Sequence, residues 1–101
     1  MITAYQHIEL DAQGVPWIAG RNIKVVEIVA EHLAYRWDAA QIRSQHPHLT
    51  LGEIHSALAY YFDHEQAIKD DLDRRLKRAD QIIASMGESS VQHKLQARLR
   101  P

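Results

Sequence analysis

The chain has 101 residues, a formal net charge of −1 and no cysteine. An apolar share of 46% and a charged share of 25% are those of an ordinary globular protein with one domain. The absence of cysteine excludes disulfides, thiolate nucleophiles and cysteine-based metal or iron–sulfur sites. The first residues lack the pattern of a signal peptide, and no segment reaches the roughly 20 apolar residues that span a bilayer. We therefore expect a cytoplasmic protein that makes no membrane contact.

A short β-hairpin or paired arm is the first predicted element, over residues 1–22. The runs HIELD and VPWIA alternate as strands do and are joined by the turn-like AQG. Pro16 restricts the second run to a sheet edge or to the start of a strand, because proline has no N–H to donate. Gly20 is expected to end the arm.

Residues 23–62 are predicted to form a helical core. In the run IKVVEIVAEHLAYR, apolar side chains recur at spacings of three and four, which is the pattern of one buried helix face. Several of them are β-branched and weaken the intrinsic helix propensity. Packing against other elements must therefore hold this helix.

Two capping patterns follow, in WDAAQI at residues 37–42 and LTLGEI at residues 49–54. In each, a short side chain that accepts hydrogen bonds, Asp38 or Thr50, stands three residues before Gln41 or Glu53. This is the spacing at which two side chains satisfy the free N–H groups of a helix start. Pro47 ends the first helix after about two turns. A short helix, a tight turn and a second helix form the helix-turn-helix arrangement.

A long charged helix is predicted over residues 63–87. FDHEQA at 62–67 repeats the capping pattern more weakly and indicates a third helix start or a bend. At about 1.5 Å per residue the helix reaches roughly 36 Å, which is more than so small a core can cover. The following acid–base pairs have the favourable i,i+4 order: Glu65/Lys69, Asp70/Arg74, Asp71/Arg75 and Asp73/Lys77.

A narrow apolar seam runs along this helix, and a basic amphipathic tail follows at residues 88–101. The seam either packs back on the domain or binds a second helix, from another copy or from another protein. The tail is expected to order only on binding. The residues predicted for a partner or dimer interface are Ile68, Leu72, Leu76, Ile83, Leu95 and Leu99.

Motifs of catalysis are missing from the sequence. It contains no HExxH, no glycine-rich phosphate loop and no GxSxG, and the pair His46-Pro47-His48 is too common to define a metal site. We expect no enzymatic activity and no cofactor.

An ordered run of motifs extends from GVPWIAG at residues 14–20 through IKV at 23–25 to HPHLT at 46–50 and ALAY at 57–60. It resembles the bacterial domain of unknown function 433, a family similar to antitoxins of the VapB type. The likeness covers about residues 3–65. It implies a dimeric helix-turn-helix domain of the homeodomain-like or winged kind, sometimes encoded beside a PIN-type ribonuclease toxin. The family usually carries G-T-R-I where this chain has Gly20-Arg21-Asn22-Ile23.

Two functions are compatible with these patterns. The first is a dimeric, non-enzymatic DNA-binding antitoxin or autorepressor whose C-terminal helix and tail bind a protein partner. The second is a dimeric protein-interaction module that keeps the helix-turn-helix as a scaffold and binds no DNA. For the first function the basic residues would contact phosphates and the others base edges: Arg21, Lys24, Arg36 and Arg43 for phosphates, and Thr50, His55 and Ser56 for bases.

Overall fold

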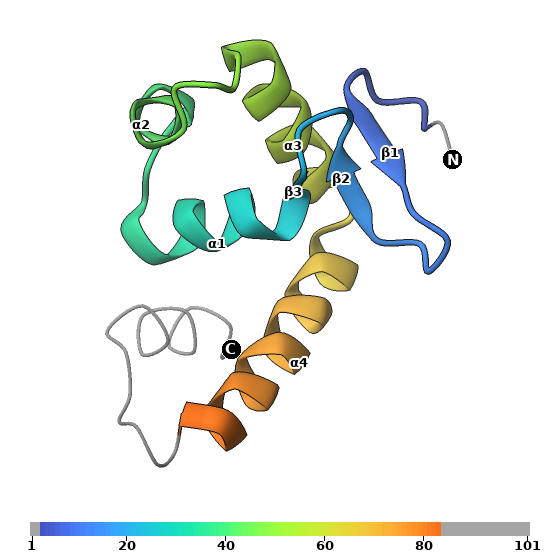
Figure 1. Ribbon diagram of the computed structural model, residues 1–101, viewed down its shortest axis with the longest axis vertical. Helices are drawn as coiled ribbons and strands as arrows, with labels where there is room; N and C mark the ends of the chain where they lie inside the picture. The colour runs from blue at the N-terminus through green and yellow to red at the C-terminus, as the bar shows by residue number, and fades with distance from the viewer. Residues whose placement is uncertain (1–2, 84–101) are drawn as a thin grey trace.

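The computed structural model describes residues 3–83, which form a small N-terminal sheet followed by helices (Figure 1). The elements are β1 (Ile8–Leu10), β2 (Pro16–Ile18), β3 (Ile23–Lys24), α1 (Val25–Tyr35), α2 (Ala39–Gln45), α3 (Leu51–Asp63) and α4 (Glu65–Ile83). The mainly helical fold with an N-terminal β element confirms the prediction at this level. In Figure 1, α4 runs away from the sheet and lies below α1 in the view.

The sheet is antiparallel with the strand order β1-β2-β3. Ile8 lies opposite Ile18 in the predicted hairpin. The third strand, β3, was not predicted, because two residues carry no periodicity that a sequence pattern can detect. Pro16 is the first residue of β2, the central strand, and this placement at a strand start agrees with the expected restriction.

Asp11 organises the turn between β1 and β2. Its Oδ1 accepts the N–H groups of Gln13 at 2.9 Å and Val15 at 3.0 Å, and its Oδ2 accepts the indole N–H of Trp17 at 2.9 Å. The Trp17 indole N–H is the largest cause that lowers the pKa of the Asp11 carboxyl, and the Val15 N–H adds to it. On β3, the Lys24 ammonium lies 4.9 Å from the centre of the Trp17 ring.

One apolar core joins the sheet to the helices that follow. Ile8 and Ile18 from the sheet pack in the same cluster as side chains of α1, α2, α3 and α4. Within α1 the β-branched residues Val25, Ile28 and Val29 are fully buried. Their burial supplies the stabilisation that their helix propensity does not.

Two histidines make hydrogen bonds at the connections between helices. His46, in the connection from α2 to α3, places Nε2 at 2.7 and 2.9 Å from the two carboxylate oxygens of Glu31 on α1. Since a carboxylate only accepts, Nε2 must carry a proton there. His64, between α3 and α4, has Nδ1 2.9 Å from the carbonyl oxygen of Tyr60. These bonds fix the turns that set the angles between successive helices.

The predicted third start at FDHEQA is a bend between α3 and α4 at His64. Asp63 accepts a hydrogen bond from the hydroxyl of Tyr5 at 2.6 Å. The N-terminal segment is thereby attached to the end of α3.

Three of the four predicted ion pairs along α4 are present: Glu65–Lys69 at 3.8 Å, Asp71–Arg75 at 3.0 Å and Asp73–Lys77 at 3.0 Å. The prediction of Asp70 with Arg74 was wrong. Arg74 lies 3.5 Å from Asp71 instead, and Asp70 accepts from the Gln66 amide at 2.9 Å. Spacings of three and four residues are both close on a helix surface, so one acid can serve two bases.

Candidate functional site

The start of α3 is the best-organised polar site among residues 3–83. Thr50 Oγ1 accepts the N–H of Glu53 at 3.1 Å, and Glu53 Oε1 accepts the N–H of Thr50 at 2.9 Å. The capping box predicted from LTLGEI is therefore confirmed. Glu53 is the one buried charged residue of this part of the chain, with 5% of its surface exposed.

Arg21 neutralises this buried carboxylate. Its Nε donates to Glu53 Oε2 at 2.9 Å, and 38% of the Arg21 side chain remains exposed. Burial by itself raises the pKa of Glu53, but the Thr50 N–H and the Arg21 guanidinium outweigh burial and hold the pKa below its usual range. Glu53 is therefore ionised at neutral pH, and the terminal guanidinium nitrogens of Arg21 lie beyond the bonded Nε.

The turn between β2 and β3 positions Arg21 beside Glu53 at the start of α3. Gly20 at φ 74° and Asn22 at φ 47° both adopt left-handed backbone conformations. Glycine does so without strain, and asparagine tolerates that region better than most residues. Asn22 is thus a turn residue, and its neighbour Arg21 makes the contact to α3.

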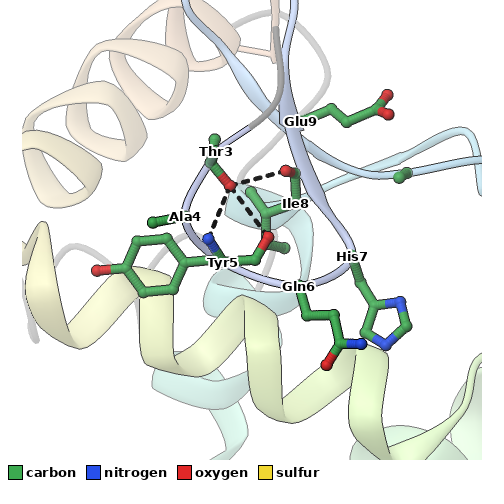
Figure 2. A pocket seen from close by; sticks show the side chains of 8 residues that line it. Thr3, Ala4, Tyr5, Gln6, His7, Ile8 and Glu9 are labelled. Carbon is green, nitrogen blue, oxygen red and sulfur yellow. Dashed lines mark hydrogen bonds between the residues drawn. The ribbon is translucent and has the colours of Figure 1, made fainter.

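The N-terminal segment adds a second flank that sequence reasoning missed. Thr3 to Glu9 loop around a hollow of about 550 Å³, and the hydroxyl of Thr3 donates to the carbonyl oxygens of Tyr5 and Ile8 (Figure 2). His7 has φ 69°, and its Nε2 would lie 3.9 Å from a Cβ built on Gly52. An imidazole therefore borders the first turn of α3. No local sequence signal marks a left-handed histidine.

The predicted phosphate-binding residues are not gathered in one patch. Lys24 directly precedes α1 and Arg36 directly follows it, which places their backbones roughly 18 Å apart. Arg43, on α2, lines a groove of about 270 Å³ together with Leu51, the first residue of α3. The structure thus brings Arg21 and Arg43 to the first turn of α3 and leaves Arg36 at the far end of α1.

The predicted base-contacting residues lie at the N-cap of α3 and in its second turn. Thr50 is exposed, but its hydroxyl oxygen is engaged in the cap. His55 is exposed and Ser56 is half-buried, on the side opposite Ile54, Ala57, Leu58 and Tyr61. His55 is therefore the most available polar side chain on the outward face of this helix.

The seam of α4 is covered within the chain. Ile68, Leu72 and Leu76 are only 4%, 5% and 7% exposed and belong to the core cluster, since α4 contacts α1 and α3. This corrects the expectation that the three form an open interface and agrees with the alternative that the seam packs on the domain. Leu95, Leu99 and the side chain of Ile83 lie outside the described residues.

Residues 3–83 hold no cluster of three or more side chains suited to bind a metal ion. None of the helices in this range combines the length and apolarity needed to cross a bilayer.

Comparison with known families gives one result. The family described as "Protein of unknown function (DUF433)" matches residues 11–61, and the chain belongs to this family. The matched range extends from the β1–β2 turn to the last turns of α3, and it contains both Arg21 and Glu53. No curated protein and no solved structure gives a significant match.

Proposed function

We propose that the protein is a DNA-binding antitoxin or autorepressor in which α2 and α3 form a helix-turn-helix and α3 enters the major groove. The observation that carries the proposal is the placement of Glu53. A carboxylate in the first turn of a recognition helix would repel phosphate, but this one is buried and paired with Arg21. Leu51 to Phe62 include no other acidic residue, so the outward face of α3 suits an anionic duplex.

Three kinds of donor surround the start of α3. They are the outer guanidinium nitrogens of Arg21, the Arg43 side chain, and the backbone N–H groups that the capping box does not use. Helix starts favour anions because their free N–H groups and the helix dipole point outward. Such contacts position a protein on the phosphate backbone. With few basic residues and a net charge of −1, few counterions are released on binding, so the affinity should be low and is best measured at low salt.

Electrophoretic retardation of the duplex upstream of the protein's own gene tests this function. We expect retardation at low salt that is lost or strongly reduced in Arg43→Ala. Arg78→Ala is the matched control, because it removes the same charge from an exposed position on α4 and should leave retardation unchanged. No retardation at any salt concentration would contradict DNA binding.

The antitoxin role is supported by the family's likeness to VapB-type antitoxins. In this role the chain is a homodimer that also covers the active site of a PIN-type ribonuclease, and the α4 end and residues 88–101 supply the protein contact. Inhibition of a PIN-type nuclease encoded beside this gene, measured as RNA cleavage with and without the protein, tests the role. Removal of the residues after Gly87 should abolish inhibition and spare DNA retardation.

A second candidate function, a protein-interaction module that binds no DNA, is supported by Phe62. Its side chain is 58% exposed near the end of α3, and Leu51 at the other end is 41% exposed. Exposed apolar residues that share a face suit a protein contact. A dimer in light scattering that dissociates in Phe62→Ser, in a protein that ignores DNA, would favour this function over the first.

A further inference from the structure

The outward face of α3 lacks the side chains that recognise purines by paired hydrogen bonds. Between Leu51 and Phe62 there is no arginine, lysine, asparagine or glutamine. Guanine is read in the major groove mainly by arginine or lysine, and adenine mainly by asparagine or glutamine. If α3 enters a major groove, its own side chains make no bidentate contact to either of these two bases.

Apolar surface is what α3 offers there instead. Leu51, the first residue of the helix, is 41% exposed. It lines the 270 Å³ groove together with four other residues and no acidic side chain. These are the apolar Ala40 and Pro47, the hydroxyl-bearing Ser44 and the basic Arg43. An apolar floor beside a guanidinium suits a ligand that carries an apolar group next to an anion.

We infer that α3 selects thymine, through contact between its 5-methyl group and Leu51, with Arg43 on a neighbouring phosphate. Among the four standard bases, thymine alone presents a methyl group in the major groove. Apolar side chains are the usual partners of this methyl group. This inference rests on the proposed DNA binding and adds base preference to it. Arg43 supplies affinity at any sequence, whereas Leu51 supplies the preference.

His55 extends the same face by one turn. It is exposed and lies four residues after Leu51, and residues at this spacing are neighbours on a helix surface. A single imidazole makes one hydrogen bond and not a bidentate pair, so it discriminates weakly between bases. The methyl contact is therefore the main source of specificity from α3.

The test compares two duplexes of alternating sequence, one built from dA and dT and the other from dA and dU, which lacks only the methyl groups. Fluorescence anisotropy at low salt gives both dissociation constants for the full chain. We expect dU to weaken binding about fourfold for each contacted methyl. The variant Leu51→Ala should bind the two duplexes equally, while Leu51→Met, which keeps an apolar side chain of similar size at this position, should keep the wild-type ratio.

The outcomes separate the inference from the function on which it rests. Binding of both duplexes with equal affinity by the wild type would overturn the thymine preference and leave DNA binding intact. Binding of neither duplex, nor of the upstream DNA, would overturn both. A dT preference that persists in Leu51→Ala would also overturn the assignment to this residue.

Discussion

The starts of α2 and α3 use the same capping arrangement for different purposes. In α2, Asp38 and Gln41 exchange hydrogen bonds of 2.9 Å, and both side chains are exposed. In α3, the returning residue is the buried Glu53, which also holds Arg21 from the sheet. With the neutral amide of Gln41, the capping box contains only contacts within the helix start. With the carboxylate of Glu53, it also makes a tertiary contact to a distant residue. In α3, and not in α2, the side chain that completes the capping box also bonds a residue outside its own helix.

Truncation of the side chain that bonds back to the N-cap, Glu53 in α3 or Gln41 in α2, should give the largest difference in stability between the two helix starts. Glu53→Ala removes the bond to the Thr50 N–H and leaves Arg21 without its carboxylate, so we expect a loss of about 2 kcal/mol in the free energy of unfolding. The partial exposure of Arg21 keeps this below the cost of breaking a fully buried pair. Gln41→Ala should cost about 0.5 kcal/mol. Urea unfolding measures both, and equal losses would contradict the tertiary role of Glu53.

The N-cap residues themselves should behave alike. Asp38→Ala and Thr50→Ala each remove one side chain that accepts a helix N–H, and each should cost about 1 kcal/mol. The measurement is again the urea midpoint at constant slope. A much larger loss for Thr50→Ala would show that the cap residue, and not Glu53, couples α3 to the sheet.

Acidification should affect the two starts differently. The pKa of Glu53 is lowered in the folded state, so its contribution is complete above the unfolded value near 4.3 and is lost as the pH falls through the folded value. Gln41 does not titrate. Asp11, whose pKa is also lowered, adds a loss of the same sign. Glu53→Gln should therefore lose less stability than the wild type between about pH 5 and pH 2. Parallel curves for the two proteins would contradict this.

Local motifs of the sequence predicted the helices well. The pairs Asp38/Gln41 and Thr50/Glu53 span three residues each, so the chemistry of capping fixes them without reference to the fold. The apolar periodicity of α4 likewise identified which face is buried. It did not reveal what covers that face, because periodicity records the need for a partner and not the partner's identity.

Long-range contacts explain what the sequence did not predict. Arg21 and Glu53 are separated by 32 positions, so the sequence pattern predicts a phosphate contact for Arg21 and does not predict its bond to α3. His7 and the short strand β3 depend on the turns around them, in which His7 and Asn22 adopt positive φ values. Tertiary packing stabilises such backbone conformations, and no residue spacing in the sequence predicts them.

The second helical position makes the smallest and most specific comparison between the two starts. It is Ala40 in α2 and Gly52 in α3. A Cβ on Gly52 would meet only Thr50 Oγ1 at 3.8 Å and His7 Nε2 at 3.9 Å, which are ordinary contacts. Gly52→Ala should therefore stabilise the fold by about 0.5 kcal/mol, and Ala40→Gly should destabilise it by a similar amount.

The absence of a side chain at Gly52 thus has no internal cause, and the proposed function supplies an external one. Glycine allows a backbone to approach a ligand closely. If α3 lies against DNA, the added methyl group should weaken retardation of the upstream duplex even though the protein becomes more stable. Opposite changes in thermal stability and DNA affinity are not expected from a defect in folding. Unchanged or tighter DNA binding by Gly52→Ala would show that the start of α3 does not closely approach the duplex.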